Sequence, residues 1–151
     1  SKAVSLAAQL TSGLTSDVEA LTAIYEYVTA NITYDNEKAA TVSGNYLPDI
    51  DETLSTKKGI CFDYASLMAA MLRSQKIPTK VVVGYAGDIY HAWISVYVDG
   101  SGWIDGYIYF DGNKWNRMDP TFAASAKDEN DYKSIVDFIS DGSNYSVIYY
   151  Y

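Results

Sequence analysis

The chain has 151 residues, of which 48% are hydrophobic and 20% charged, and it carries a net charge of −8. This length is enough for one domain with a hydrophobic core and too short for two ordinary domains. The basic residues never cluster, which argues against nucleic acid as a partner. No apolar run approaches the roughly 18 residues that a transmembrane helix needs. The acid excess is most simply a solubility feature, although it would also attract a basic substrate such as a lysine-bearing peptide.

Helical signals dominate the N-terminal part of the chain. Residues 1–12 are expected to form a short helix or a loose arm. Ser16 and Glu19 then have the spacing of a capping box, in which each residue satisfies a backbone N–H of the other. Apolar residues at spacings of three and four predict a helix from this cap to Asn31, which we expect to end it in the left-handed conformation.

A polar stretch separates this helix from the next one. Residues 32–34 read as extended, and residues 35–50, which include Gly44 and Pro48, predict a long loop rather than a helix or strand. A loop of that length inside a compact domain is usually functional. Residues 51–57 are expected to form a single helical turn.

The one cysteine of the chain, Cys61, stands at the start of the next predicted helix. Gly59 precedes it, and a single apolar stripe follows along good helix formers to about Lys76. The first turn of a helix presents free N–H groups and the positive end of the dipole, which favour a thiolate and could hold an oxyanion. A lone cysteine is, however, often only a small buried hydrophobic residue.

The pattern changes to strands after Pro78. Residues 124–144 are polar and expected to be irregular, and the order of helices first and antiparallel strands later indicates an α+β fold with the helices on one side of the sheet. The predicted strands have β-branched or alternating character, and a strong hairpin signal at 111–113 joins two of them. These strands are residues 79–85, 91–98, 103–104, 107–110, 114–118 and 145–151.

The single histidine, His91, lies at the start of a predicted strand. Histidine exchanges protons near neutral pH, and a cysteine nucleophile needs such a base. The base in turn needs a third group that fixes its tautomer, for which Asp119 is the best candidate. If strands 91–98 and 114–118 are neighbours, His91 and Asp119 meet at one edge of the sheet, against which the Cys61 helix would pack.

Other catalytic chemistries fit the sequence less well. One cysteine and one histidine fall short of the three or four ligands of a zinc site. Asp49, Asp51 and Glu52 do not follow the spacing of a calcium-binding EF-hand loop. No Gly-x-Ser-x-Gly sequence is present for a serine nucleophile. We therefore expect neither a metal nor another cofactor.

Three segments together resemble the bacterial transglutaminase-like superfamily: Gly59–Ala65, Tyr90–Trp93 and Met118–Thr121. In that family Gly-x-Cys opens a helix, His-Ala-Trp opens a strand and Asp-Pro-Thr ends the next strand. All three motifs occur here in the family's order, and the resemblance covers about residues 45–122. It implies a papain-like core, in which one helix carries the thiol against an antiparallel sheet.

The resemblance also implies acyl transfer through a thioester. Cys61 would attack an amide carbonyl, and His91 would take the thiol proton and then protonate the leaving amine. Asp119 would orient His91. The acyl group would pass to water, as in a peptidase or amidase, or to an amine, as in a transglutaminase. The expected substrate is a peptide or protein, and a cell-wall peptide is one candidate.

The sequence departs from the large animal transglutaminases, which have a tryptophan upstream of the cysteine as oxyanion donor. All three tryptophans here lie downstream of Cys61. The donor is therefore expected from the 35–50 loop, with Tyr46 or Asn45 as candidates, and calcium activation is not carried over. The alternative reading is a non-catalytic peptide- or glycan-binding module that keeps this fold, which the 15 tyrosines favour.

We expect a single domain over residues 1–151, with N-terminal helices in 1–58, a catalytic core in 59–122 and a C-terminal extension in 123–151. The start without methionine, the few lysines and the many tyrosines favour a secreted or cell-envelope protein, with a cytoplasmic location left open. The sequence gives no information on the oligomeric state.

Overall fold

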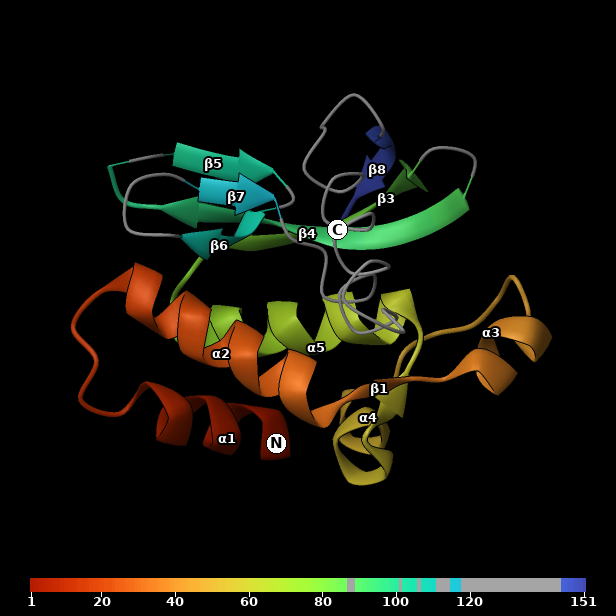
Figure 1. Cartoon of the computed structure of the whole chain (residues 1–151), viewed down its shortest axis with the longest axis horizontal. Coiled ribbons are helices and arrows are strands. Elements are labelled where there is room, and N and C mark those ends of the chain that lie inside the picture. Colours follow the sequence, from red (N-terminus) through yellow and green to blue (C-terminus); the bar gives the residue numbers. More distant parts are fainter. Residues whose placement is uncertain (87–88, 101, 106, 111–114, 118–144) are drawn as a thin grey trace, which may run out of the picture.

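A computed structural model shows a layer of helices beneath one face of an antiparallel sheet (Figure 1). It describes residues 1–86, 89–100, 102–105, 107–110, 115–117 and 145–151. Within these ranges no helix is both long enough and apolar enough to cross a bilayer. The helices are α1 (Lys2–Thr11), α2 (Asp17–Asn31), α3 (Asn36–Thr41), α4 (Ile50–Thr56) and α5 (Cys61–Ser74). The strands are β1 (Thr33–Tyr34), β2 (Lys58–Gly59), β3 (Thr79–Ala86), β4 (Ile89–Val98), β5 (Gly102–Asp105), β6 (Tyr107–Phe110), β7 (Trp115–Arg117) and β8 (Tyr145–Tyr150).

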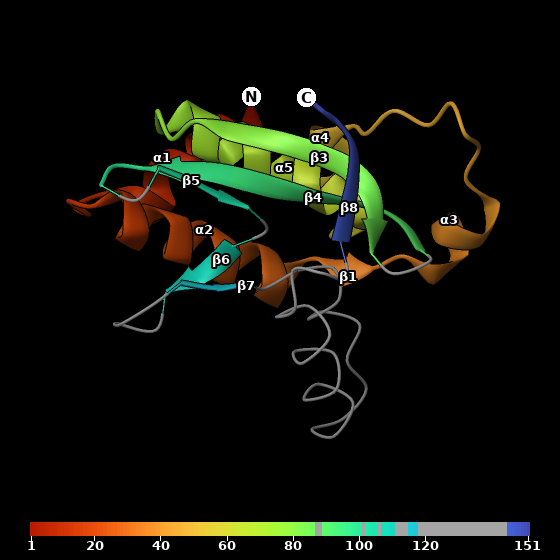
Figure 2. The same cartoon turned by 90° about the horizontal axis from the view of Figure 1, so that it is seen from above.

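Helix α5 is the centre of the core. It lies directly against the sheet, and α1 and α2 cover its other side (Figures 1 and 2). Burying a large apolar side chain stabilises a fold by roughly 1.5–3 kcal/mol, so this helix contributes strongly to stability. Its fully buried apolar side chains are Tyr64, Leu67, Met68, Met71 and Leu72.

The predicted cap at the start of α2 is correct, whereas the backbone conformation predicted for its end is wrong. The Ser16 hydroxyl accepts a hydrogen bond from the Glu19 N–H at 3.1 Å, as the cap predicts. The helix does end at Asn31, but not in the left-handed conformation. Ile32 follows with extended backbone (φ −101°, ψ 129°), which leads the chain straight into β1.

The polar stretch 35–50 is not a continuous loop as predicted, because α3 forms within it. Asp35 caps that helix by accepting a hydrogen bond from the Lys38 N–H at 3.0 Å. None of the residues of α3 is buried, so the sequence has no apolar periodicity from which this helix could be predicted. The turn expected at 51–57 is present as α4, for which the Asp49 carboxylate is the N-cap.

The main sheet has the strand order β5-β4-β3-β8, and β6 pairs with β7 in a separate two-stranded sheet. The condition considered above, that strands 91–98 and 114–118 are neighbours, is not met among the described residues, because β4 pairs with β3 on one side and with β5 on the other. The chain turns at Gly100 (φ +86°), and β5 then pairs with β4 in antiparallel register. The final strand was predicted correctly, and it pairs with β3. The predictions for 111–113 and 124–144 lie outside the described residues.

Candidate active site

Cys61 is the first residue of α5 and is half-buried. Ile60 stands at the N-cap position with extended backbone, and its side chain offers no acceptor to the N–H groups of the first turn. The Ile60 N–H itself donates to Asp63 Oδ2 at 2.9 Å. The thiol therefore lies at a helix N-terminus whose first N–H groups have no side-chain cap, which favours negative charge at this position.

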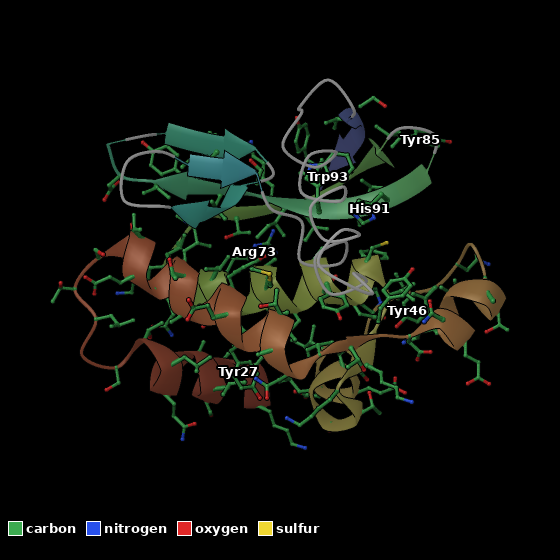
Figure 3. The ribbon with its side chains drawn as sticks, viewed as in Figure 1. Tyr27, Tyr46, Arg73, Tyr85, His91 and Trp93 are labelled. Carbon is green, nitrogen blue, oxygen red and sulfur yellow. The ribbon has the colours of Figure 1, made fainter. Side chains whose placement is uncertain are left out.

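A cleft of about 770 Å³ opens beside Cys61. Its lining includes His91 of β4, so the fold brings the only cysteine and the only histidine of the chain to one cavity. The imidazole is 3% exposed and lies above the end of α5 that carries Cys61 (Figure 3). His91 is the third residue of β4 rather than its first. Asp119 lies outside the described residues, so its role stays a prediction.

The two predicted oxyanion donors also line this cleft. Asn45 is exposed in the segment between α3 and α4. The Tyr46 hydroxyl donates a short hydrogen bond of 2.5 Å to Asp63 Oδ1, and Tyr46 points toward the start of α5 in Figure 3. A phenol has one hydrogen to donate, so in this arrangement Tyr46 gives it to Asp63 rather than to the cleft.

The carboxylate of Asp63 is fully buried and has three donors. Besides Ile60 and Tyr46, it forms an ion pair with Lys38 of α3, whose Nζ lies 3.3 Å from Oδ2. Burial opposes the charge on Lys38, but its contacts with Tyr46 and Asp63 outweigh this, and the pKa of Lys38 is raised. Asp63 thereby joins α3 and the cleft wall to the first turn of α5.

Comparison with known proteins assigns the family. A profile of the transglutaminase-like superfamily matches residues 4–120. The chain belongs to this superfamily. The YebA protein of Bacillus subtilis is 31% identical over an alignment of 119 residues, and the match covers 66% of this chain and 16% of YebA. The MJ1282 protein of Methanocaldococcus jannaschii is 32% identical over an alignment of 98 residues, and the match covers 54% of this chain and 26% of that protein. The chain thus spans only a small part of these relatives.

Solved structures confirm the transglutaminase-like fold. A proposed cysteine protease from Cytophaga hutchinsonii has a TM-score of 0.64 at 19% identity over 99% of this chain and 42% of its own. A proposed protease from Parabacteroides distasonis has a TM-score of 0.57 at 22% identity, covering 69% and 23% of the two chains. A structure described as a TGase has a TM-score of 0.53 at 23% identity, and the match covers 89% of this chain and 34% of that one. At these identities the likeness shows the fold alone, and the superfamily is one of thiol-dependent enzymes.

The sequence did not reveal all residues around the thiol of this transglutaminase-like chain. Asp63 stands at the third position of α5, where an acidic side chain commonly bonds back to the N-cap, and this was the available signal. Tyr34 also lines the cleft, but it reaches Cys61 through a two-residue parallel ladder that has no local sequence signature. Among the described residues no group of three potential ligands could hold a metal ion.

Gly59 is required here by close packing rather than by flexibility. A Cβ at this position would lie 2.6 Å from the Cβ of Asp63. We expect Gly59→Ala to lower the free energy of unfolding by about 2 kcal/mol. Neither the backbone at Gly59 nor that at Asp63 can move away without disturbing the buried Asp63 carboxylate. Gly44→Ala is the matched control, since a Cβ there meets nothing within 4 Å. Equal denaturation midpoints for the two variants would contradict this prediction.

Proposed function

We propose that this chain catalyses acyl transfer from amide bonds of peptides or proteins through a thioester on Cys61. The observation that carries the proposal is the shared cleft of Cys61 and His91 at the N-terminal end of a buried helix. A thiol, a base and unpaired N–H groups of a helix are the components that covalent acyl transfer requires. The membership of a thiol-dependent superfamily supports the same conclusion.

The reaction follows from these positions. His91 takes the thiol proton, and the sulfur attacks the amide carbonyl carbon, forming the C–S bond while the carbonyl pair moves to oxygen. The C–N bond then breaks, and the imidazolium returns the proton to the leaving amine. Water or an amine displaces the sulfur from the thioester. Asp119 is proposed to orient His91, as in other triads.

The shape of the cleft favours an extended substrate. Its lining follows one face of α5 from Cys61 to Arg73, about 18 Å at roughly 1.5 Å per residue. Small side chains of that face form the floor, and apolar side chains of β3 face it. No aspartate or glutamate side chain belongs to the described lining, so the described part of the cleft offers no acidic side chain to a basic substrate. We propose an uncharged stretch of peptide, from a protein or a cell wall, as the acyl donor.

A mixed peptide library tests the proposal. The protein is incubated with the library, with and without a primary amine, and products and protein are analysed by mass spectrometry. We expect cleaved or amine-extended peptides and a transient acyl adduct on Cys61, and the ratio of products identifies the acceptor. Protein alkylated beforehand at Cys61 is the control. Products that form equally with the alkylated protein would refute the thioester mechanism.

A non-catalytic binding module is the second candidate, and one observation favours it. Aromatic side chains are exposed on the sheet, and Lys80 lies over two of them, 3.8 Å from the Trp103 ring centroid and 5.2 Å from that of Tyr150. Such a surface could stack on a glycan or peptide. If this candidate is correct, Trp103→Ala abolishes ligand binding, whereas alkylation of Cys61 changes nothing that can be measured.

A further inference from the structure

Tyr34 is held beside the thiol by backbone pairing. It ends β1, which runs parallel to β2 with Tyr34 opposite Gly59, and Cys61 follows Gly59 by two residues. The Asp35 N–H donates to the Gly59 carbonyl at 2.9 Å, which fixes the backbone directly after Tyr34. In Figure 1, β1 lies next to the end of α5 at which that helix begins.

The hydroxyl of Tyr34 differs from those of two neighbouring tyrosines. Tyr46 donates to Asp63, and Tyr64 donates to the Ile32 carbonyl at 2.8 Å. The Tyr34 hydroxyl has no hydrogen-bond partner among the residues that the structure describes, although the side chain is half-buried and lines the cleft with Cys61 and His91. A partly buried phenol that faces a cavity without a partner is suited to donate to a ligand there.

We propose that the Tyr34 hydroxyl donates a hydrogen bond to the oxyanion that forms when the Cys61 sulfur attacks the substrate carbonyl. This inference rests on the proposed function. It assigns Tyr34 the role that the sequence gave to Tyr46 or Asn45. Together with the N–H groups at the start of α5, the phenol supplies the second donor of an oxyanion hole.

The protonation state of Tyr34 suits this role. Burial, and then the negative charge of the nearby Cys61, raise the pKa of the Tyr34 hydroxyl above its ordinary value. The phenol therefore keeps its proton at neutral pH and has it available to donate. Asn45 is the weaker candidate, because it is exposed on a segment that lacks backbone pairing with the Cys61 region.

The variant Tyr34→Phe tests the inference with two readouts. We expect kcat for amide cleavage to fall by about 10²- to 10³-fold, with KM nearly unchanged, because the donor acts on the transition state. The rate of Cys61 alkylation by iodoacetamide should stay within about twofold, because displacement of iodide creates no carbonyl oxyanion. Removing a hydroxyl without a described partner breaks no known hydrogen bond, and thermal unfolding verifies that the fold is kept.

The outcomes separate this inference from the proposed function. Tyr27→Phe is the matched control, because it removes the hydroxyl of a half-buried tyrosine that does not belong to the described cleft lining, and it should keep kcat within a few fold. An unchanged kcat in Tyr34→Phe overturns the Tyr34 assignment alone. Alkylation that falls in parallel with kcat also overturns it, since Tyr34 then acts on the thiolate. If the native protein shows no turnover that depends on Cys61, the proposed function fails and the Tyr34 assignment fails with it.

Discussion

Replacing Cys61 by alanine is expected to lower kcat/KM for amide cleavage by about 10⁴-fold or more, to the level that binding and the oxyanion donors alone provide. In the proposed mechanism the Cys61 sulfur forms the covalent bond, and the sequence contains no second cysteine that could replace it. Alanine is a good helix former, and the half-buried Cys61 side chain is small, so α5 should be retained. Steady-state kinetics and thermal unfolding of the same preparation check both statements.

The companion variant His91→Ala is expected to lose a similar factor. Nucleophile and base act as one unit, so the double variant should be no slower than Cys61→Ala alone. Iodoacetamide alkylation of Cys61 should also slow in His91→Ala, because the base that takes the thiol proton is missing. Full turnover by Cys61→Ala, or additive losses in the double variant, would exclude the mechanism.

The parts of the site that sequence predicted are those with local signals. The apolar stripe from Tyr64 to Leu72 fixes α5, and Cys61 at its start follows from that helix alone. His91 belongs to a run of alternating residues whose partner strand, β3, is the element before it. Short-range pairing of this kind is readable because consecutive elements usually lie next to each other.

The parts that sequence missed depend on contacts between distant segments. The sequence left the neighbours of β4 open, because alternating strands carry no local signal for their partner beyond the preceding element, and in the structure β5 pairs with β4 after the turn at Gly100. Helix α3 has no buried residue and is attached to the core by Lys38, whose partner lies on α5. Tyr34 likewise approaches Cys61 through a parallel ladder that pairs residues far apart in the chain.

Replacing Asp63 by alanine is expected to lower the free energy of unfolding by about 3 kcal/mol. The carboxylate is fully buried, and its loss leaves the Ile60 N–H and the Tyr46 hydroxyl without their acceptor. Lys38 adds less, because its side chain is 25% exposed and can turn to water. Chemical denaturation measures the difference, and Asp51→Ala is the matched control, since that exposed carboxylate has no described partner.

The same variant should affect catalysis in a way that separates anchoring from chemistry. Without Asp63 the segment 42–48 loses its bond through Tyr46 to α5, so the cleft wall is no longer fixed. We expect KM to rise by about tenfold while kcat falls less, the opposite of the pattern for Tyr34→Phe. Tyr46→Phe removes one of the three bonds to Asp63 and should reproduce part of the KM effect. A loss confined to kcat in Asp63→Ala would mean that this carboxylate acts on the reacting groups rather than on the wall of the cleft.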